Sequence, residues 1–275
     1  MISSDQLHQL LPEVRRIAQQ AGDIIMDVYE NGFEIETKQD NSPVTTADMA
    51  AHHYIEAALK QLSPQFPILS EESAHLPFAE RASRETYWLV DPLDGTKEFI
   101  KRRDSFTVNI ALIDQHQSVL GVIDAPAMGI SYYASQGLGS FKQEKAGEEV
   151  QIHTREMPAL PVFAGSRSHI GKQLEAFLNN VKAVHGDYQL LSMGSSLKMC
   201  LVAEGVADLY PRLWLTSEWD TAAAHCIVNE AGGKLVQTDM SPLRYNTKDS
   251  LLNPYFFTIG NNTIDWSQYL PAEDL

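Results

Sequence analysis

The sequence has few cysteines, and their positions exclude two common roles. Cys200 and Cys226 form no Cys-x-x-Cys pair and lie at no spacing typical of a metal site. Small apolar-like thiols of this kind are usually buried. We therefore expect both to be reduced and buried, as in a cytosolic protein.

Basic residues are also scarce. The chain carries 21 Lys and Arg against 36 Asp and Glu, a formal net charge of −15. This balance argues against a nucleic-acid backbone as partner, because two polyanions repel. It does not exclude a small phosphate substrate, since divalent cations can bridge an acidic site and a phosphate. We attribute most of the acidity to solvated surface.

Long apolar runs are missing as well. No uninterrupted apolar stretch approaches the roughly 18 residues that a membrane span needs, and the first residues lead into a polar helix pattern without a signal-peptide core. We expect no integral membrane segment and a cytoplasmic protein. A length of 275 residues with 44% apolar and 21% charged residues is typical of one large or two ordinary globular domains.

The first half reads as two helices and a sheet. Apolar residues at helical spacing predict a helix from a Ser3/Ser4 cap to Asn31-Gly32, and a second helix opens at residues 44–48 and runs to about Leu62. Strands are expected at 33–38 and 67–69 and as an antiparallel meander over 106–141. The adjacent His52 and His53 point in different directions, so we expect no metal there.

The second half alternates strands with helices. Residues 142–156 are charged and weakly patterned, and Pro158 and Pro161 mark the best boundary. We therefore predict an α+β domain over 1–157 and an α/β domain over 158–275. The expected strands are 162–164, 188–193, 207–210, 234–237 and 255–259, and the expected helices are 170–179, 195–203 and 218–230.

The most informative stretch runs from Trp88 to Thr96. Its apolar start predicts a buried strand, which Asp91-Pro92 should end because proline cannot donate to a sheet ladder. Asp91 and Asp94 then lie at the carboxyl end of a strand, where open α/β sheets bind ligands. Gly95 permits close backbone approach, and Thr96 suits a helix start. The alternative is a turn without chemistry.

Further carboxylates can join this pair. Glu71 follows the strand at 67–69, and Asp220 opens the helix at 218–230. Hard oxygen ligands without a convergent Cys/His set favour Mg²⁺ or Mn²⁺ over zinc. Each acid also has a simpler interpretation: Asp48 and Asp220 as helix-start residues, and Glu72 as solvated surface.

These motifs resemble the inositol monophosphatase superfamily, lithium-sensitive and magnesium-dependent phosphomonoesterases. The resemblance spans about Thr45 to Gly233 and rests on Glu71, on Asp91-Pro-Leu-Asp94-Gly-Thr96 and on Trp219-Asp220-Thr-Ala-Ala. Finer details are similar to its 3'(2'),5'-bisphosphate nucleotidase branch. They are Ser42-Pro-Val-Thr-Thr-Ala-Asp48, Asp94-Gly-Thr-Lys-Glu-Phe-Ile100, Phe106-Thr-Val-Asn-Ile-Ala111, Gly165-Ser-Arg-Ser-His169 and Gly194-Ser-Ser-Leu-Lys198.

The resemblance implies a layered α-β-α-β-α sandwich with two, possibly three, Mg²⁺ ions between its two parts, Mn²⁺ being a substitute. It implies that Glu71, Asp91 and the Leu93 carbonyl hold one metal, and that Asp91, Asp94 and Asp220 hold the second. Glu71 is also carried over as a catalytic residue. Asp48 and Thr96 would orient the attacking water and accept its proton.

The implied substrate is adenosine 3',5'-bisphosphate, which would yield AMP and phosphate in sulfur assimilation; 3'-phosphoadenylyl sulfate is a second candidate. Phosphate transfer would go directly to water, because paired divalent ions can clamp the attacking and leaving oxygens in line. Gly95 and Thr96 would bind the reacting phosphate at a helix start. The full substrate set is Glu71, Leu93, Asp94, Gly95, Thr96, Ser195, Lys198 and Asp220, with Arg167, Tyr210 and Arg212 as weaker candidates.

Three alternatives remain open at this point. An inositol monophosphatase or sugar bisphosphatase would share the metal core. A haloacid-dehalogenase phosphatase has an Asp-x-Asp-x-Thr motif, but Asp91 and Asp94 are one residue too far apart for it. A metal-binding regulatory module would need no Thr96 and no Asp48. Family members can also associate with the inner face of the inner membrane, although the sequence shows no basic patch for that.

Overall fold

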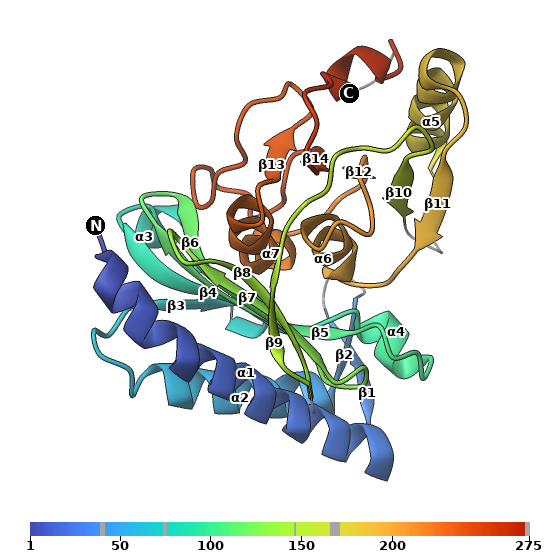
Figure 1. The fold of residues 1–275 in the computed structure, drawn as a ribbon. Coiled ribbons are helices and arrows are strands. Elements are labelled where there is room, and N and C mark those ends of the chain that lie inside the picture. The colour runs from blue at the N-terminus through green and yellow to red at the C-terminus, as the bar shows by residue number, and fades with distance from the viewer. Residues whose placement is uncertain (39–41, 74–75, 146, 166–170, 273–275) are drawn as a thin grey trace.

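The structure is a computed structural model that describes residues 1–38, 42–73, 76–145, 147–165 and 171–272. Within those residues no helix is both long enough and apolar enough to cross a membrane. The chain forms a layered α-β-α-β-α sandwich, which confirms the expected fold class (Figure 1).

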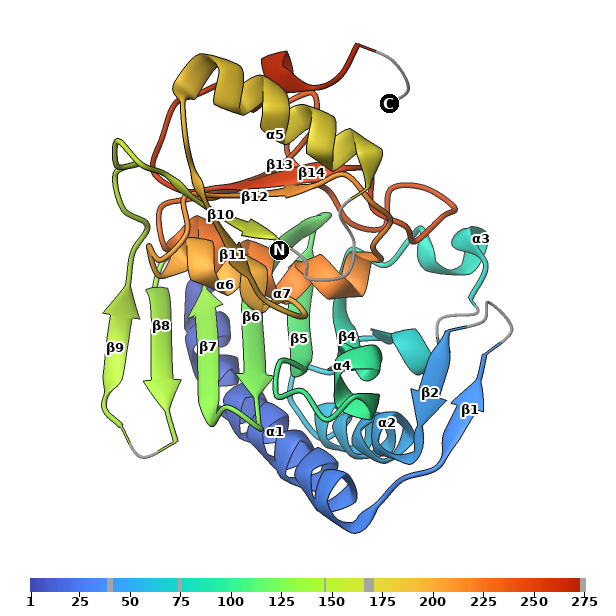
Figure 2. The same cartoon turned by 90° about the vertical axis from the view of Figure 1, so that its right-hand side faces the viewer.

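Two long helices form the first layer. α1 (Ser4–Asn31) begins with a capping box between Ser3 and Gln6 and ends at Gly32, whose φ of 103° few other residues adopt. α2 (Thr46–Leu59) begins with a capping box between Thr45 and Asp48. Both helices bury an apolar face against the first sheet, in a cluster that continues into its strands (Figure 2).

The second layer is a seven-stranded sheet in the order β3-β4-β5-β6-β7-β8-β9. β3 and β4 are parallel and every later pair is antiparallel. Its strands are β3 (Ile68–Ser70), β4 (Thr86–Asp94), β5 (Thr107–Asp114), β6 (Gln117–Ala125), β7 (Ile130–Ser135), β8 (Gly139–Glu144) and β9 (Glu149–Ile152).

The third layer consists of α6 (Leu197–Ala203) and α7 (Glu218–Glu230), which lie between the two sheets (Figure 2). α7 packs closely on β6, because a Cβ on Gly121 would stand 2.1 Å from the carbonyl oxygen of Ala223. One buried apolar cluster includes residues of both sheets and both helices. α7 is therefore fixed by contact with the first sheet.

The outer layers hold a five-stranded sheet in the order β11-β10-β12-β14-β13, covered by α5 (Lys172–His185) and the 3₁₀ turn η2 (Trp266–Tyr269). β10 pairs in parallel with β11 and β12, and the remaining pairs are antiparallel. Its strands are β10 (Val162–Gly165), β11 (Gln189–Ser192), β12 (Leu209–Arg212), β13 (Lys234–Gln237) and β14 (Phe256–Ile259).

Several expected boundaries were wrong. The stretch 142–156 is not merely charged linker: it holds the end of β8 and the edge strand β9, whose largely exposed residues hide the apolar pattern. The second helix begins at Thr46 and ends at Leu59, and residues 43–45 form β2 (Pro43–Thr45) against β1 (Ile35–Thr37). Two short turns of helix, α3 (Phe78–Arg81) and η1 (Glu71–Ser73), were not predicted.

The predicted domain division at 157/158 stays a proposal. The chain passes from the first sheet to the second between β9 and β10, which agrees with its position. The apolar cluster shared by both sheets means that the two parts bury surface against each other. Cys200 and Cys226 are free and buried in this region, as expected.

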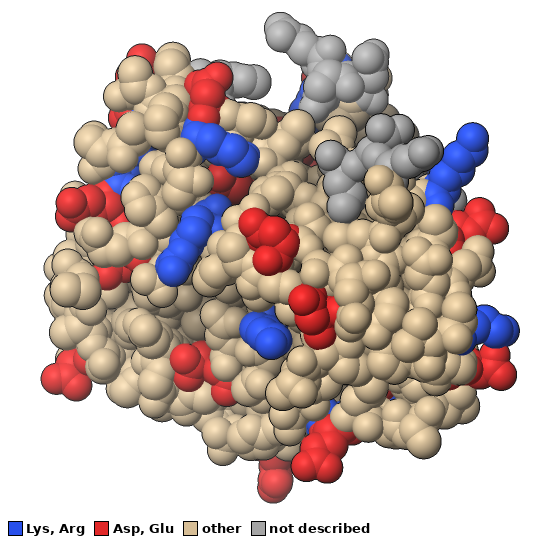
Figure 3. Space-filling model, turned by 90° about the horizontal axis from the view of Figure 1, so that it is seen from above, with Lys and Arg blue, Asp and Glu red and all other residues tan. Residues whose placement is uncertain are grey.

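Charge is spread thinly over the face seen in Figure 3. There lysine and arginine side chains lie singly among acidic and uncharged residues over the C-terminal layer.

On the part of the chain that the structure describes, His52 is buried and its ring nitrogen bonds the hydroxyl of Ser70 at 3.0 Å.

Candidate active site

The end of β4 presents two carboxylates. Asp91 pairs with Asn109 of β5 and Asp94 with Thr107, and the register shifts between them. The strand therefore continues to Asp94, contrary to the expectation that it ends at Asp91-Pro92. The proline, which has no N–H to donate, sits within this irregularity. Leu93 donates its backbone N–H to Asp91 Oδ1 at 3.1 Å, which folds the chain back on itself.

Asp220 comes from the first turn of α7. It is the third residue of a capping box, in which Ser217 donates its backbone N–H to Asp220 Oδ2 at 2.9 Å. The simple helix-start interpretation is thus correct for one oxygen. The other oxygen is left for a ligand, so capping and ligation are compatible in the same side chain.

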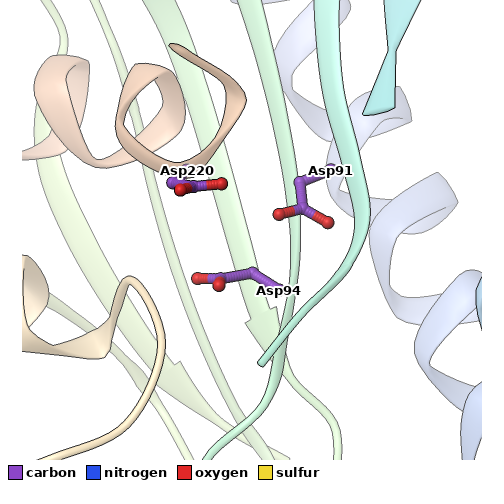
Figure 4. Close-up of side chains that lie close together, drawn as sticks. All are labelled: Asp91, Asp94 and Asp220. Carbon is purple, nitrogen blue, oxygen red and sulfur yellow. The ribbon is translucent and has the colours of Figure 1, made fainter. Parts of the chain in front are cut away.

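Asp91, Asp94 and Asp220 converge on one point. Each offers a carboxylate oxygen, and these atoms lie within 4.8 Å of one another (Figure 4). Burial, and then the neighbouring carboxylates, raise the pKa of Asp91 well above its usual value. Burial and then Asp94 do the same to the pKa of Asp220. Concentrated negative charge of this kind is relieved by a cation.

Glu71 stands beside this group, at the start of η1 directly after β3. Lys38 Nζ lies 2.7 Å from a carboxylate oxygen of Glu71 and 2.7 Å from one of Glu72. The Glu72 side chain is only 5% exposed, so its expected place on the solvated surface was wrong. It lies under Lys38 instead. Burial raises the pKa of Glu71, and Lys38 opposes that shift.

Asp48 and Thr96 meet across the cavity wall. The Thr96 hydroxyl donates to Asp48 Oδ1 at 3.1 Å, and it is also 3.3 Å from the Leu93 carbonyl oxygen. Asp48 Oδ2 accepts from the Thr45 hydroxyl and backbone N–H at 2.6 and 2.8 Å. Burial raises the pKa of Asp48, and the bonds from Thr45 oppose the rise. The capping and catalytic interpretations of Asp48 again concern different oxygens.

Gly95 makes the turn between Asp94 at the end of β4 and Thr96 at the start of α4. Its φ of 93° and ψ of 35° are left-handed, and it caps α4 (Thr96–Ile100). A Cβ there would lie 3.3 Å from the carbonyl oxygen of Ser105. Glycine therefore fits both the conformation and the close approach. Thr96 begins α4, as the sequence predicted, and this helix has five residues.

These side chains line one cavity of about 430 Å³. Its lining includes the carboxylates of Glu71, Asp91, Asp94 and Asp220 together with Leu93, Gly95 and Thr96. Ser195, Lys198, Tyr210 and Arg212 also line it. Lys198 is buried, its Nζ bonds the carbonyl of Ser195, and it lies 5.6 Å from the ring centre of Tyr210. Burial lowers the pKa of Lys198 to about 8.

All the predicted site residues line this cavity except two. Asp48 lies behind Thr96, whose hydroxyl donates to it, and Arg167 lies outside the described residues. Sequence reasoning missed Lys38, because a lysine in a short edge strand region carries no motif. It also gave no role to Thr107, Asn109 and Ser196, which surround Asp94.

The residues present fit a divalent cation. Three hard carboxylate oxygens from two elements converge, and burial together with the neighbouring carboxylates raises the pKa of Asp91 and of Asp220. Oxygen-only ligands of this kind are typical of Mg²⁺, Mn²⁺ or Ca²⁺ and not of zinc in a sulfur or nitrogen site.

Comparison with known proteins identifies the class. The model of the inositol monophosphatase family matches residues 6–262, so the chain belongs to that family, which is metal-dependent. Within it, the chain is 47% identical over 249 residues to 3'(2'),5'-bisphosphate nucleotidase CysQ of Salmonella typhimurium, covering 90% of this chain and 98% of the relative. The CysQ of Haemophilus influenzae is 37% identical over 262 residues, covering 94% and 95%.

A solved structure gives the same picture. The crystal structure of CysQ from Bacteroides thetaiotaomicron superposes with a TM-score of 0.82 at 38% identity, covering 94% of this chain and 98% of that one. An inositol monophosphatase from Thermotoga maritima superposes with a TM-score of 0.74 at 23% identity, which speaks for the fold alone.

Proposed function

We propose that this chain is a magnesium-dependent 3'(2'),5'-bisphosphate nucleotidase, which hydrolyses the 3'-phosphate of adenosine 3',5'-bisphosphate to AMP and phosphate. The observation that carries the proposal is one cavity that joins the Asp91, Asp94 and Asp220 carboxylates to the Thr96–Asp48 hydrogen bond. The CysQ relatives, nearly full-length matches, support the substrate.

The carboxylates would hold two Mg²⁺ ions, possibly three, with Mn²⁺ as a substitute. Glu71, Asp91 and the Leu93 carbonyl would hold the first, and Asp91, Asp94 and Asp220 the second. Such ions supply a lowered pKa for water and neutralise charge on the transferring phosphoryl group. Asp91 suits the shared position, since its carboxylate faces Asp94 and Asp220 (Figure 4), and Glu71 is, after burial, the group that most raises its pKa.

Thr96 and Asp48 would move the proton. Thr96 Oγ can accept a hydrogen bond from the attacking water while it donates to Asp48. Thr45 holds Asp48 Oδ2, so Asp48 Oδ1, which accepts from Thr96, keeps one direction. Glu71 would act with them as a catalytic residue next to the water. The phosphoryl group passes directly to water in line, and no phospho-enzyme forms.

Three residues of the cavity lining suit a second phosphate and a base. Lys198 and Arg212 are cationic, and Tyr210 offers an aromatic face. With its lowered pKa, Lys198 is still mainly protonated at pH 7 and would turn from the Ser195 carbonyl to the 5'-phosphate. Gly95 and Thr96 would contact the reacting phosphate. The same residues could accept 3'-phosphoadenylyl sulfate.

The test is phosphate release with Mg²⁺ from adenosine 3',5'-bisphosphate, inositol 1-phosphate and fructose 1,6-bisphosphate, side by side. We expect a strong preference for the nucleotide and inhibition by lithium. Preference for either other substrate would keep the metal site and overturn the nucleotidase. Release from none of the three would leave a metal-binding protein without this activity.

A second measurement tests the direct transfer. A phosphatase that forms an aspartyl phosphate is trapped by beryllofluoride, whereas direct transfer to water leaves no aspartate modified. We expect no beryllofluoride adduct and no phosphorylated aspartate during turnover.

We further propose that the protein works in the cytoplasm, in sulfur assimilation, where the nucleotide bisphosphate is a by-product. Association with the inner face of the membrane is tested by sedimentation with vesicles.

A further inference from the structure

One oxygen of Asp94 is enclosed by hydrogen-bond donors. The Ser195 hydroxyl and the Ser196 backbone N–H each donate to Asp94 Oδ2 at 2.6 Å, and Asn109 Nδ2 approaches it at 3.5 Å. None of these bonds engages Oδ1. The carboxylate is therefore held in one orientation, in which one of its oxygens lies within 4.8 Å of carboxylate oxygens of Asp91 and Asp220 (Figure 4).

A second ring of side chains holds those donors. Thr107 Oγ1 lies 2.5 Å from Ser195 Oγ and 2.9 Å from Ser196 Oγ, and the Ser196 hydroxyl donates to Asn109 Oδ1 at 2.9 Å. Thr107, Asn109 and Ser196 are buried. Groups that touch no ligand but fix the groups that do are a regular part of metal sites.

We propose that Thr107 and Ser196 are positioning residues that fix Asp94 for the second metal ion. This inference rests on the proposed metal role of Asp94. Thr107 is not among the residues that line the cavity, and it acts through Ser195; Ser196 acts through its own backbone N–H and through Asn109. They raise metal affinity by removing rotamers of Asp94 in which the carboxylate points away from Asp91 and Asp220.

Counting hydrogens gives the network a direction. Ser195 has one hydroxyl hydrogen and gives it to the charged carboxylate, the strongest acceptor present. The 2.5 Å contact between Ser195 and Thr107 then needs the hydrogen of Thr107. The contact of 3.0 Å between Thr107 and Asn109 Oδ1 is the other position for that hydrogen. The Ser195 hydroxyl thus points toward Asp94, and the Thr107 hydroxyl points either toward Ser195 or toward Asn109.

The backbone of Ser195, whose hydroxyl the network needs, has a strained conformation. Ser195 has a φ of 53°, an uncommon conformation for a residue with a side chain. Its loop lies tightly on the strand entry, since a Cβ on Gly194 would stand 2.4 Å from Ser105 Oγ. The Lys198 ammonium bonds the Ser195 carbonyl from the other side. Strain kept at this position supports a role for the exact place of the Ser195 hydroxyl.

The network also joins the two parts of the chain. Thr107 and Asn109 belong to β5 of the first sheet, whereas Ser195 and Ser196 precede α6 below the second sheet. The orientation of a metal ligand from one part therefore depends on hydroxyls from the other. Metal affinity reports how well the two parts are seated on each other.

The experiment is Mn²⁺ binding to the substrate-free protein, followed by the electron paramagnetic resonance signal of the free ion. The variants are Thr107→Val, which keeps the shape and loses the hydroxyl, and Ser196→Ala, which keeps the backbone donor. Thr107→Ser restores the hydroxyl. Thr258→Val is the matched control, because Thr258 is a buried threonine in β14 whose hydroxyl has no partner. Asp94→Asn defines the site.

We expect the Kd for the Asp94-dependent Mn²⁺ to rise about 10- to 100-fold in Thr107→Val and in Ser196→Ala, with the other site unchanged. Thr107→Ser and Thr258→Val should bind as the wild type does. Wild-type affinity in both Thr107→Val and Ser196→Ala overturns the positioning role while the nucleotidase stands. If Asp94→Asn itself binds Mn²⁺ like the wild type, the metal role of Asp94 fails, and this inference fails with it.

Discussion

Thr96 and Asp48 stand 48 positions apart in the chain, and the Thr96 hydroxyl donates a hydrogen bond of 3.1 Å to Asp48 Oδ1. Asp48 cannot turn away, because Thr45 occupies its other oxygen twice. The pair therefore offers one hydroxyl oxygen to the cavity at a fixed place. This relationship links the N-terminal helix layer to the carboxylates of β4 and α7.

Replacing Thr96 by Val should lower kcat about 10²- to 10⁴-fold, the usual size of a general acid–base contribution. Thr96→Ser keeps the hydroxyl and should retain most of the activity. The measurement is steady-state kinetics on adenosine 3',5'-bisphosphate with circular dichroism as a check of folding. Equal activity in Thr96→Val and Thr96→Ser would show that the hydroxyl takes no part in proton transfer.

Asp91→Asn should lower activity to below about 1% of the wild type, because losing a ligand costs more than losing an outer-shell partner. The fold should persist, since the side chain keeps its volume. Burial, and then repulsion from the neighbouring carboxylates, raises the pKa of Asp91, so the metal-free variant should be as stable as the wild type or more so. Thermal unfolding with and without Mg²⁺ checks this. Activity within tenfold of the wild type would contradict the site.

Lys38→Met should destabilise the metal-free protein by about 1–3 kcal/mol, because it leaves the Glu71 and Glu72 carboxylates without their counter-charge. Burial by itself would lower the pKa of Lys38, but both glutamates override that effect and raise it, so the ammonium stays charged at neutral pH. Urea unfolding without and with Mg²⁺ measures the loss, which the cation should reduce.

The matched control for Lys38 is Lys60→Met. Lys60 pairs with Glu56 at 2.8 Å, but its side chain is 59% exposed, so its removal should cost less than about 0.5 kcal/mol. Equal losses in both variants would mean that Lys38 is an ordinary surface ion pair.

Gly121→Ala should displace α7 and destabilise the protein by about 1–3 kcal/mol or more, because the new methyl group meets the Ala223 backbone at 2.1 Å. Asp220 is on the same helix, so activity should fall along with stability. Gly137→Ala is the comparison: it has nothing within 4 Å, and its φ of 83° should cost only about 1–2 kcal/mol. Full activity in Gly121→Ala would show that α7 can shift without moving Asp220.

Asp124→Asn should change how stability depends on pH. Burial raises the pKa of Asp124 to about 6, with the Ser131 hydroxyl and Lys145 opposing and Asp23 reinforcing the rise. Between the unfolded value of 3.8 and about 6 the folded state binds more protons, so the wild type loses stability as pH rises through that window.

The Asp124→Asn variant has no titrating carboxyl group at this position, so it does not lose this stability as the pH rises. Its stability relative to the wild type should therefore increase between pH 4 and pH 7, by roughly 1–3 kcal/mol at about 1.4 kcal/mol for each pKa unit. The free energy of unfolding in urea, taken for both proteins at several pH values, gives the difference. A constant difference across the window would show that Asp124 titrates normally.

The long elements could be predicted because their patterns are local. α1 and α7 carry caps, apolar spacing and glycine stops, and both boundaries agree with the sequence. β9 could not, since an edge strand with three exposed residues has no buried face to mark it. α5 begins at Lys172 after Gly171 and continues to His185, past the predicted end at residue 179, and the predicted start at Ile170 lies outside the described residues.

The residues of the site likewise fall into those that the sequence could predict and those that it could not. Asp91-Pro-Leu-Asp94-Gly-Thr96 could be recognised because the chemistry and the turn lie within six residues. Glu72 could not be placed, because the same acidic pair at a strand end fits solvent or Lys38, and only packing chooses. Ser195 was expected to bind substrate, and its hydroxyl is found on Asp94.

The sequence by itself determined the helix starts, the strand that carries Asp91 and Asp94, and the acidic ligand set, because these depend on spacing along one segment. The tertiary structure alone decided that Asp220 approaches within 4.8 Å of Asp91 and Asp94, that Lys38 neutralises Glu71, and that Thr107 supports Asp94 through Ser195. Those contacts join residues from 33 to 129 positions apart. The packing of α7 and of the Ser195 loop on the first sheet brings Asp220 and Ser195 to Asp94, and the approach of the segment after β1 to η1 brings Lys38 to Glu71.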